Sequence, residues 1–247
     1  MKYKLGICTR FRDAVEWKGN KLNHIDKYFA QIFSQRHIDM DEVGIFLLEG
    51  NSSDNTYDKL VECQDTCHMH LFKQEELVKT DIVTISGSTE DSSRLRMMGQ
   101  LGAALLNKAR TQCESVIWME SDLIYYNHNL FHKLLKGANE LDSIVAPWTW
   151  IRINGQYMFY DIWAYRNLDG SRWHFRTVKP EIPYVEMSSI GSCCAIPRCI
   201  LESSANFGDN EFLDFCKSVK DNGFKVHVDP NLEVEHPGNA YINNRWI

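Results

Sequence analysis

The stretch from Val116 to Tyr126, with the sequence VIWMESDLIYY, constrains the fold more than any other part of the chain. It opens with a short apolar run, which is typical of a buried strand in a parallel sheet. Glu120, Ser121 and Asp122 follow, and on a strand Glu120 and Asp122 would point to one face and Ser121 to the other. Two neighbouring carboxylates at a buried strand end repel each other unless protons or a cation neutralise them.

The oxygen atoms of this Glu-Ser-Asp triplet suit a hard divalent ion such as Mg²⁺ or Mn²⁺, which commonly keeps coordination positions for substrate phosphates. The alternative is a surface turn whose acidic groups face water. Apolar residues on both sides of the triplet, with Leu123 and Ile124 on the far side, favour the buried interpretation. We therefore predict a metal site at Glu120 and Asp122.

Strand-like and helix-like segments alternate through the first two thirds of the chain, which predicts an α/β fold. We expect a single Rossmann-like domain with an open, mostly parallel, twisted sheet and helices on both faces. The predicted strands are 4–8, 43–48, 82–85, 116–119, 143–146, 157–165, 190–196 and 224–228. Helical spacing runs through 25–33, 57–69, 95–109 and 129–135, and a last helix is predicted from Asp209 to a stop at Gly223. Polar loops are expected at 9–13 and 229–238.

The composition narrows the class of protein. The 247 residues are 44% hydrophobic, which is enough for a sizeable core. A net charge of −6 and the lack of a long Lys/Arg run argue against a nucleic acid or an anionic membrane as the main partner. No apolar run is long enough for a membrane span or a signal peptide. The eight cysteines are scattered, so we expect reduced thiols and a cytoplasmic location, in the host cytoplasm if the chain is viral.

Further polar clusters follow the predicted strands at their carboxyl ends, where open α/β sheets bind ligands. Thr9, Arg10 and Arg12 follow the first strand, and a loop that begins at Glu49 follows the second. Arginine side chains suit phosphate groups, and Glu49 suits the hydrogen-bond donors of a ribose or a base. The alternative for each arginine is a solvated surface charge. With the Glu-Ser-Asp triplet, these clusters predict one shared site.

The segment FYDIWAYR combines large rings with charged hydrogen-bonding groups. Its members Tyr160, Asp161, Trp163 and Arg166 form a mixture that suits the face of a sugar and its hydroxyls. On a strand, however, Tyr160 and Asp161 would face opposite ways. Not all four side chains would then line one pocket, and part of the aromatic surface would belong to the core.

The chain resembles nucleotide-sugar glycosyltransferases of the GT-A fold. The resemblance rests on the strand ending in LLEGNSSDNT, on the Glu-Ser-Asp triplet and on FYDIWAYR, and it covers residues 4–237. The segments are most similar to fungal capsule-associated and mannan-type mannosyltransferases and to related viral or microbial enzymes. The commoner motif in such enzymes is Asp-x-Asp, and the fungal relatives usually carry a membrane anchor.

This resemblance implies transfer of a sugar from a nucleoside-diphosphate sugar to a hydroxyl of a glycan or glycoprotein, with Mn²⁺ or Mg²⁺ as cofactor. Residues 1–126 would form the nucleotide-binding half of one domain, and 127–247 the acceptor-binding half. Asp122 and Glu120 would hold the metal with His236, whose alternative is a loop histidine bonded to a backbone carbonyl. The residues implied in binding the nucleotide sugar are Thr9, Arg10, Arg12, Glu49, Asn51, Arg94 and Ser121.

The resemblance also implies a carboxylate at the start of a helix near the acceptor. The motif GDNEF matches that place, so Asp209 is the first candidate for the acceptor base and Glu211 the second. The alternative for Asp209 is a helix cap. Tyr160, Asp161, Trp163 and Arg166 would bind the acceptor or the transferred sugar.

Three other interpretations account for parts of the sequence. A nucleotidyltransferase that makes sugar nucleotides would carry a glycine-rich phosphate loop after the first strand, and CTRFRD has no glycine. A non-catalytic carbohydrate-binding module would explain the aromatic residues but not the acidic triplet. Zinc would fit the cluster of Cys63, Cys67, His68 and His70, yet the chain has no paired CxxC motif.

Overall fold

The computed structural model describes residues 1–17, 20–64, 67–79, 91–123, 125–153, 156–161, 163–173 and 180–236. The helices are α1 (His24–Phe33), η1 (Met40–Glu42), α2 (Thr56–Glu62), α3 (Gln74–Leu77), α4 (Ser92–Arg110), α5 (Leu130–Leu141), α6 (Arg198–Glu202) and α7 (Phe212–Asp221). The strands are β1 (Tyr3–Phe11), β2 (Glu16–Trp17), β3 (Asn20–Lys21), β4 (Val43–Glu49), β5 (Met69–Lys73), β6 (Cys113–Met119), β7 (Tyr125–Tyr126), β8 (Ser143–Ile153), β9 (Gln156–Phe159), β10 (Val185–Glu186), β11 (Cys193–Ile196) and β12 (Lys225–His236).

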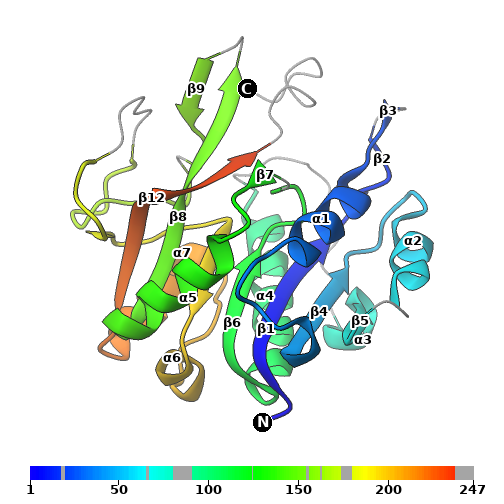
Figure 1. The fold of residues 1–247 in the computed structure, drawn as a ribbon, viewed down its shortest axis with the longest axis horizontal. Coiled ribbons are helices and arrows are strands. Elements are labelled where there is room, and N and C mark those ends of the chain that lie inside the picture. The colour runs from blue at the N-terminus through cyan, green and yellow to red at the C-terminus, as the bar shows by residue number, and fades with distance from the viewer. Residues whose placement is uncertain are drawn as a thin grey trace.

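One large sheet organises the part of the chain that the structure describes. Its strand order is β10-β12-β8-β11-β6-β1-β4-β5, with β7 paired to β12 and β9 paired to β8 (Figure 1). The ladders β1–β4, β1–β6, β4–β5 and β8–β12 are parallel and carry most of the paired residues, whereas β11 runs antiparallel to both of its neighbours. The predicted α/β fold with a mostly parallel sheet is confirmed.

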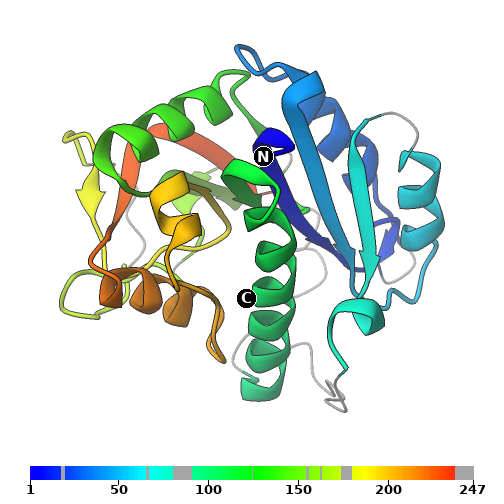
Figure 2. The ribbon, with the colours of Figure 1, turned by 90° about the horizontal axis from the view of Figure 1, so that it is seen from below.

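Helices cover both faces of this sheet, as predicted. One core lies between the sheet and α1, α2 and α5, and the other lies between the sheet and α4, α6 and α7. Figure 2 shows α1 and α5 on one side of the strands and α4 and α7 on the other. The β4 sequence VGIFLLE is buried along its whole length because both of its faces are covered.

The long helix α4 forms where the spacing of apolar residues predicted it. Leu95, Leu101 and Leu105 are buried against the sheet, and the Asp91 side chain caps the helix by accepting a hydrogen bond from the Ser93 N–H at 2.9 Å. The helix α7 ends at Asp221, shortly before Gly223, which has a φ of +85°. The start of α4 and the end of α7 are therefore set by local residues.

Several predictions about secondary structure were wrong. β1 continues to Phe11, so Thr9 and Arg10 belong to the strand rather than to a loop. Met69 was predicted to lie at the end of the second helix, but it begins β5, which pairs with β4. The strand predicted from 190 begins only at Cys193, and the one predicted over 157–165 ends at Phe159. The strand predicted at 82–85 lies outside the described residues.

The largest difference concerns β12, which was expected to end before a loop at 229–238. It continues to His236, because a register shift between Asp229 and Glu233 absorbs the turn-forming residues while the strand stays paired with β8. Among the described residues, no helix combines the length and the apolar character needed to cross a membrane.

Candidate functional site

A cavity of about 550 Å³ opens at the carboxyl ends of β1, β4 and β6. The predicted convergence of polar clusters at this edge of the sheet is thus partly observed, because side chains that follow β1 and β6 line the same space. Ten of the predicted site residues line the cavity: Arg10, Arg12, Arg94, Glu120, Ser121, Asp122, Tyr160, Asp161, Trp163 and Glu211.

The Glu-Ser-Asp triplet lies directly after β6, in a turn rather than on the strand. The alternation expected for a strand therefore does not apply, and Ser121 lines the cavity together with Glu120 and Asp122. A backbone hydrogen bond ties the turn to Ser192, because the Glu120 N–H donates to the carbonyl oxygen of Ser192 at 2.8 Å. The acids share the cavity because they lie in a turn at the end of β6, and not because strand geometry points them to one face.

Four carboxyl groups gather around this turn. Burial, followed by the charges of Asp122, Asp161 and Glu211, raises the pKa of Glu120 well above its ordinary value. Burial also raises the pKa of Asp161, although the Ser192 hydroxyl donates to its Oδ2 at 2.6 Å and opposes the shift. Ionising all of these carboxyl groups at once is therefore unfavourable, and a bound cation would relieve their repulsion.

Asp122 has a histidine as its partner. Its Oδ2 lies 2.9 Å from Nε2 of His236, at the end of β12. Burial opposes the charged form of Asp122, but His236 and His24 outweigh it and lower the pKa of Asp122. The His236 ring also stacks on Tyr160, with 3.9 Å between the ring centroids. The other oxygen, Oδ1, is buried and accepts no hydrogen bond from the described residues.

No group of three or more His, Cys, Asp or Glu side chains within the described residues is assembled as a ready metal site. The chemistry nevertheless fits a hard divalent cation at the triplet, because Asp122 presents an oxygen without a hydrogen-bond partner from the described residues, beside the mutually repelling carboxyl groups around Glu120. The described residues of the Cys63–His70 segment likewise form no such group for zinc. There the His70 ring packs on Phe46 and its Nε2 lies 2.9 Å from the Tyr3 hydroxyl.

Arg10 points into the cavity but is engaged by protein groups. Its guanidinium forms an ion pair with Glu211, donates to the carbonyl oxygen of Met98 at 2.7 Å, and lies 5.2 Å from the centre of the Trp118 ring. The Arg10 side chain is only 8% exposed. Arg10 therefore positions Glu211 in this structure, a contact that the sequence did not predict.

The segment 208–211 places Glu211, and not Asp209, against the cavity. Asp209 was expected to begin the last helix, but α7 begins at Phe212, and the Asp209 side chain is 64% exposed with an ion pair to Arg96 at 3.5 Å. Glu211 has a φ of +52°, a strained backbone for a residue with a side chain. Gly99 on α4 allows this segment to come close, because a Cβ atom there would overlap the carbonyl oxygen of Gly208.

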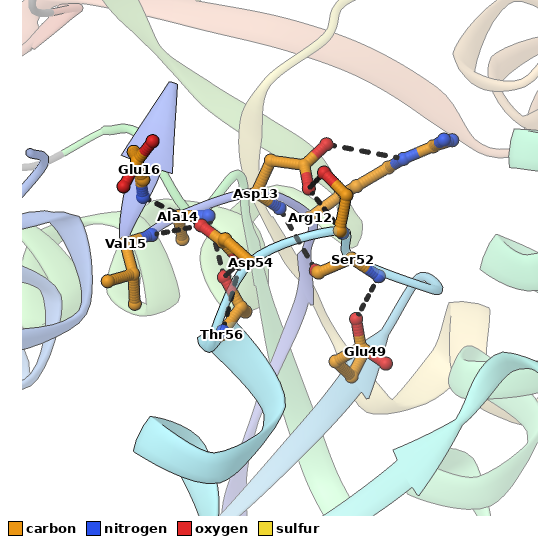
Figure 3. A network of polar contacts seen from close by, with 10 residues as sticks. Arg12, Asp13, Ala14, Val15, Glu16, Glu49, Ser52, Asp54 and Thr56 are labelled. Atoms are coloured by element: carbon orange, nitrogen blue, oxygen red, sulfur yellow. Dashed lines mark hydrogen bonds and ion pairs between the residues drawn. The ribbon is translucent and has the colours of Figure 1, made fainter. Parts of the chain in front are cut away.

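The loop after β4 is fastened to the loop after β1 by side chains that do not line the cavity (Figure 3). Asp54 accepts hydrogen bonds from the Val15 and Glu16 N–H groups at 2.9 and 2.7 Å, and Thr56 accepts one from Ala14 at 2.8 Å. Burial opposes the charge on Asp54, but these hydrogen bonds, with that from the Thr56 hydroxyl foremost, keep its pKa below the ordinary value.

Three residues predicted to bind the nucleotide sugar do not line the cavity. Glu49 is buried and accepts a hydrogen bond from the Ser52 N–H at 2.6 Å, so it supports the loop after β4. Thr9 is buried in β1, and its hydroxyl lies 2.5 Å from that of Tyr28 on α1. Asn51, in the loop after β4, has a φ of +54°.

The aromatic segment is arranged differently from the prediction. Because β9 ends at Phe159, Tyr160 and Asp161 lie beyond the strand and both line the cavity, together with Trp163. Arg166 does not line it, and its guanidinium lies 5.5 Å from the Trp163 ring. Ser192, which holds Asp161, was missed, although the Gly-Ser pair before an apolar run was a visible turn signal.

No protein-family model and no curated protein sequence matches the chain. Solved structures with a similar fold include TarS of S. aureus in complex with UDP-GlcNAc, with a TM-score of 0.60 and 11% identity over 99% of this chain and 62% of that one. Another is the mannosyltransferase PcManGT from Pyrobaculum calidifontis in complex with GDP-Man and Mn²⁺, with a TM-score of 0.54 and 11% identity over 96% of this chain and 57% of that one.

A third similar structure is GalNAc-T7 with UDP, GalNAc and Mn²⁺, with a TM-score of 0.61 and 12% identity over 95% of this chain and 44% of that one. The chain therefore spans less than two thirds of the length of each of these proteins. At such identities the likeness shows the fold, which is that of GT-A-type glycosyltransferases.

Proposed function

We propose that the chain is a metal-dependent glycosyltransferase, which moves a sugar from a nucleoside-diphosphate sugar to a hydroxyl of a glycan or glycoprotein. The observation that carries this proposal is the cavity itself. At the carboxyl ends of the parallel strands it gathers the carboxyl groups of Glu120, Asp122 and Glu211 with the arginines Arg12 and Arg94. The likeness of the fold to enzymes whose structures contain UDP-GlcNAc, GDP-Man or Mn²⁺ supports the same class of reaction.

The acidic turn is the proposed metal site, with Asp122 and Glu120 as ligands and His236 beside them. A bound Mn²⁺ or Mg²⁺ would stabilise the negative charge on the departing diphosphate. Asp122 is the stronger candidate ligand, since its pKa is lowered and it remains ionised at neutral pH. The resemblance to mannan-type enzymes stays a prediction of the sequence, and the proposal names no particular sugar.

The phosphates and the nucleoside would lie on the β1–β4–α4 side of the cavity. Arg94 and Leu95 bring the first turn of α4 to the cavity wall, where the positive end of the helix favours an anion. The Arg12 side chain is 57% exposed and is the more accessible of the arginines after β1. Ser121 is placed for contact with the donor, while Thr9, Glu49 and Asn51 would support the loop around the nucleoside.

The acceptor would approach from the side formed by residues 127–247. Glu211 is the proposed general base, because it lines the cavity and is held there by Arg10. Tyr160 and Trp163 would contact the sugar faces, and Asp161 a hydroxyl group. Asp209 and Arg166 lie outside the lining, so this proposal gives them no direct contact with the substrates.

The experiment that tests this proposal is incubation with UDP-GlcNAc, GDP-Man and related donors in the presence of Mn²⁺. Release of nucleoside diphosphate, with sugar appearing on an added glycan, is the expected result. A nucleotidyltransferase would instead exchange pyrophosphate into the sugar nucleotide, and a carbohydrate-binding module would bind without turnover. Either of those outcomes would replace the proposal.

A further inference from the structure

A second pocket, of about 810 Å³, lies where the short strand β7 joins β12. It is lined by β7, the residues leading into α5, the β8–β9 hairpin and β12, and no residue that lines it also lines the first cavity. Nothing in the proposed donor site accounts for it. We call it the β7 groove.

Aromatic rings form the apolar part of the β7 groove. Tyr125 pairs with Glu235 across β7 and β12, and Glu235 pairs with Trp150 across β12 and β8, so the three side chains share one face of the sheet. Tyr157 extends the row, with its ring edge-on to that of Trp150 at 6.2 Å between centroids. Tyr125 is 43% exposed and Tyr157 is 48% exposed. Lys27 lies over the Tyr125 ring at 5.2 Å from its centre and Arg152 over the Tyr157 ring at 5.6 Å, so a ligand would meet the exposed part of each ring that these cations leave.

Polar groups lie between and beside these rings. The Trp150 Nε1–H donates to Glu233 Oε1 at 2.9 Å, which fixes the plane of the indole. At the start of α5, the side-chain oxygen of Asn129 is buried and accepts no hydrogen bond from the described residues. Asn127 and Asn231 add amide groups, which both donate and accept hydrogen bonds. The groove thus offers both kinds of hydrogen-bonding group next to flat apolar surfaces.

This combination matches a carbohydrate better than other ligands. A sugar has an apolar face that can pack on a ring, and a rim of hydroxyls that both donate and accept. The lining carries the carboxylates of Glu233 and Glu235 and the ammonium of Lys133, and Lys27 and Arg152 lie against its two tyrosines. Acidic and basic groups thus nearly balance, and no large excess of one sign selects a charged ligand. A neutral sugar fits this balance.

The β7 groove also lies close to the proposed reaction site. Glu235 and His236 are consecutive in β12, so their side chains project from opposite faces of the strand. Glu235 lines the groove, whereas His236 bonds Asp122 in the first cavity. We propose that the β7 groove binds a neutral oligosaccharide, namely sugar units of the acceptor remote from the hydroxyl that receives the new sugar. Only this role in acceptor binding rests on the proposed function.

Titration of the intact chain with mannotetraose, chitotetraose and maltotetraose, without donor or metal, tests the inference by calorimetry. At least one of these should bind, and Tyr125→Ala and Tyr157→Ala should each weaken binding about tenfold, the loss expected for one ring contact. Tyr57→Ala, on α2 and outside both pockets, is the matched control and should bind as the wild type does. Circular dichroism melts confirm that each variant is folded.

A second measurement does not depend on the variants. Because the Trp150 indole N–H belongs to the groove, its NMR signal should shift on addition of the bound tetrasaccharide. The inference is overturned if no tetrasaccharide binds, or if the tyrosine variants bind as tightly as the wild type. Sugar transfer without tetrasaccharide binding would refute the groove alone. Binding without any transfer would refute the proposed function and leave the groove as a carbohydrate site.

Discussion

Nε2 of His236 lies 2.9 Å from Oδ2 of Asp122, across 114 residues of sequence. The contact exists because β7, directly after the acidic turn, pairs with the end of β12, with Val234 opposite Tyr126. One oxygen of Asp122 is thereby held by the imidazole, and the other is buried without a hydrogen bond from the described residues. This arrangement orients a carboxylate towards the cavity and underlies the first prediction.

Replacing Asp122 with Asn should weaken Mn²⁺-dependent binding of UDP or GDP by at least about tenfold, because even the loss of an outer-shell partner of a metal ligand typically costs about 10–100-fold in metal affinity. The amide keeps the shape of the side chain but not its charge. Calorimetry with and without EDTA measures the effect, and chelation should weaken binding by the wild type but not by the variant. Asp58→Asn, an exposed carboxylate on α2, is the control. Equal affinities for wild type and Asp122→Asn would remove Asp122 from the metal site.

Glu211→Gln should lower turnover by about 10² to 10⁴, the usual contribution of a general base, while donor affinity changes little. The amide can still accept a hydrogen bond from Arg10, so the segment keeps its position. Steady-state kinetics with a saturating acceptor provides the measurement. Asp209→Asn, in the same segment but exposed, should have the smaller effect. The reverse order would make Asp209 the base and Glu211 a structural residue.

Gly99→Ala should destabilise the protein, although alanine is favoured over glycine inside a helix by about 0.5–1 kcal/mol. The new Cβ would overlap the carbonyl oxygen of Gly208, and such overpacking typically costs about 1–3 kcal/mol. Because Gly208 precedes Glu211, turnover should also fall. Thermal unfolding and kinetics together check this, with Gln100→Ala on the same helix as the comparison. A higher melting temperature for Gly99→Ala would show that the Gly208–Glu211 segment can move away from α4 without loss of stability.

Asp54→Asn should reduce stability at neutral pH and have a smaller effect in acid. Since the folded protein lowers the pKa of Asp54, its stabilising contribution is complete above the ordinary aspartate pKa of about 3.9 and is lost as the pH falls through the lower folded value. Urea unfolding of wild type and variant between pH 7 and pH 3 provides the test. A difference in stability that does not shrink at low pH would mean that the hydrogen bonds matter and the charge does not.

Local patterns in the sequence were sufficient for the framework. β1, β4 and β6 are visible as short apolar runs, and α4 as a helical spacing of apolar residues. Each of these patterns lies within a few neighbouring residues, so it can be read without knowing the rest of the fold. The acidic triplet after β6 was found for the same reason, since a pair of acids after a buried run is unusual at the level of a few residues. The cavity confirms where those acids lie but does not test what they bind.

The tertiary structure decided which side chains meet. β5 and the second half of β12 are strands because neighbours in the sheet satisfy their backbone groups, and no window of a few residues contains those neighbours. The same long-range packing turned Glu211 towards Arg10 and left Asp209 in solvent. The sequence alone therefore determined the α/β framework and the acidic turn, because these depend on local periodicity. The partners of each functional side chain depended on contacts between distant segments, which form only when the sheet is complete.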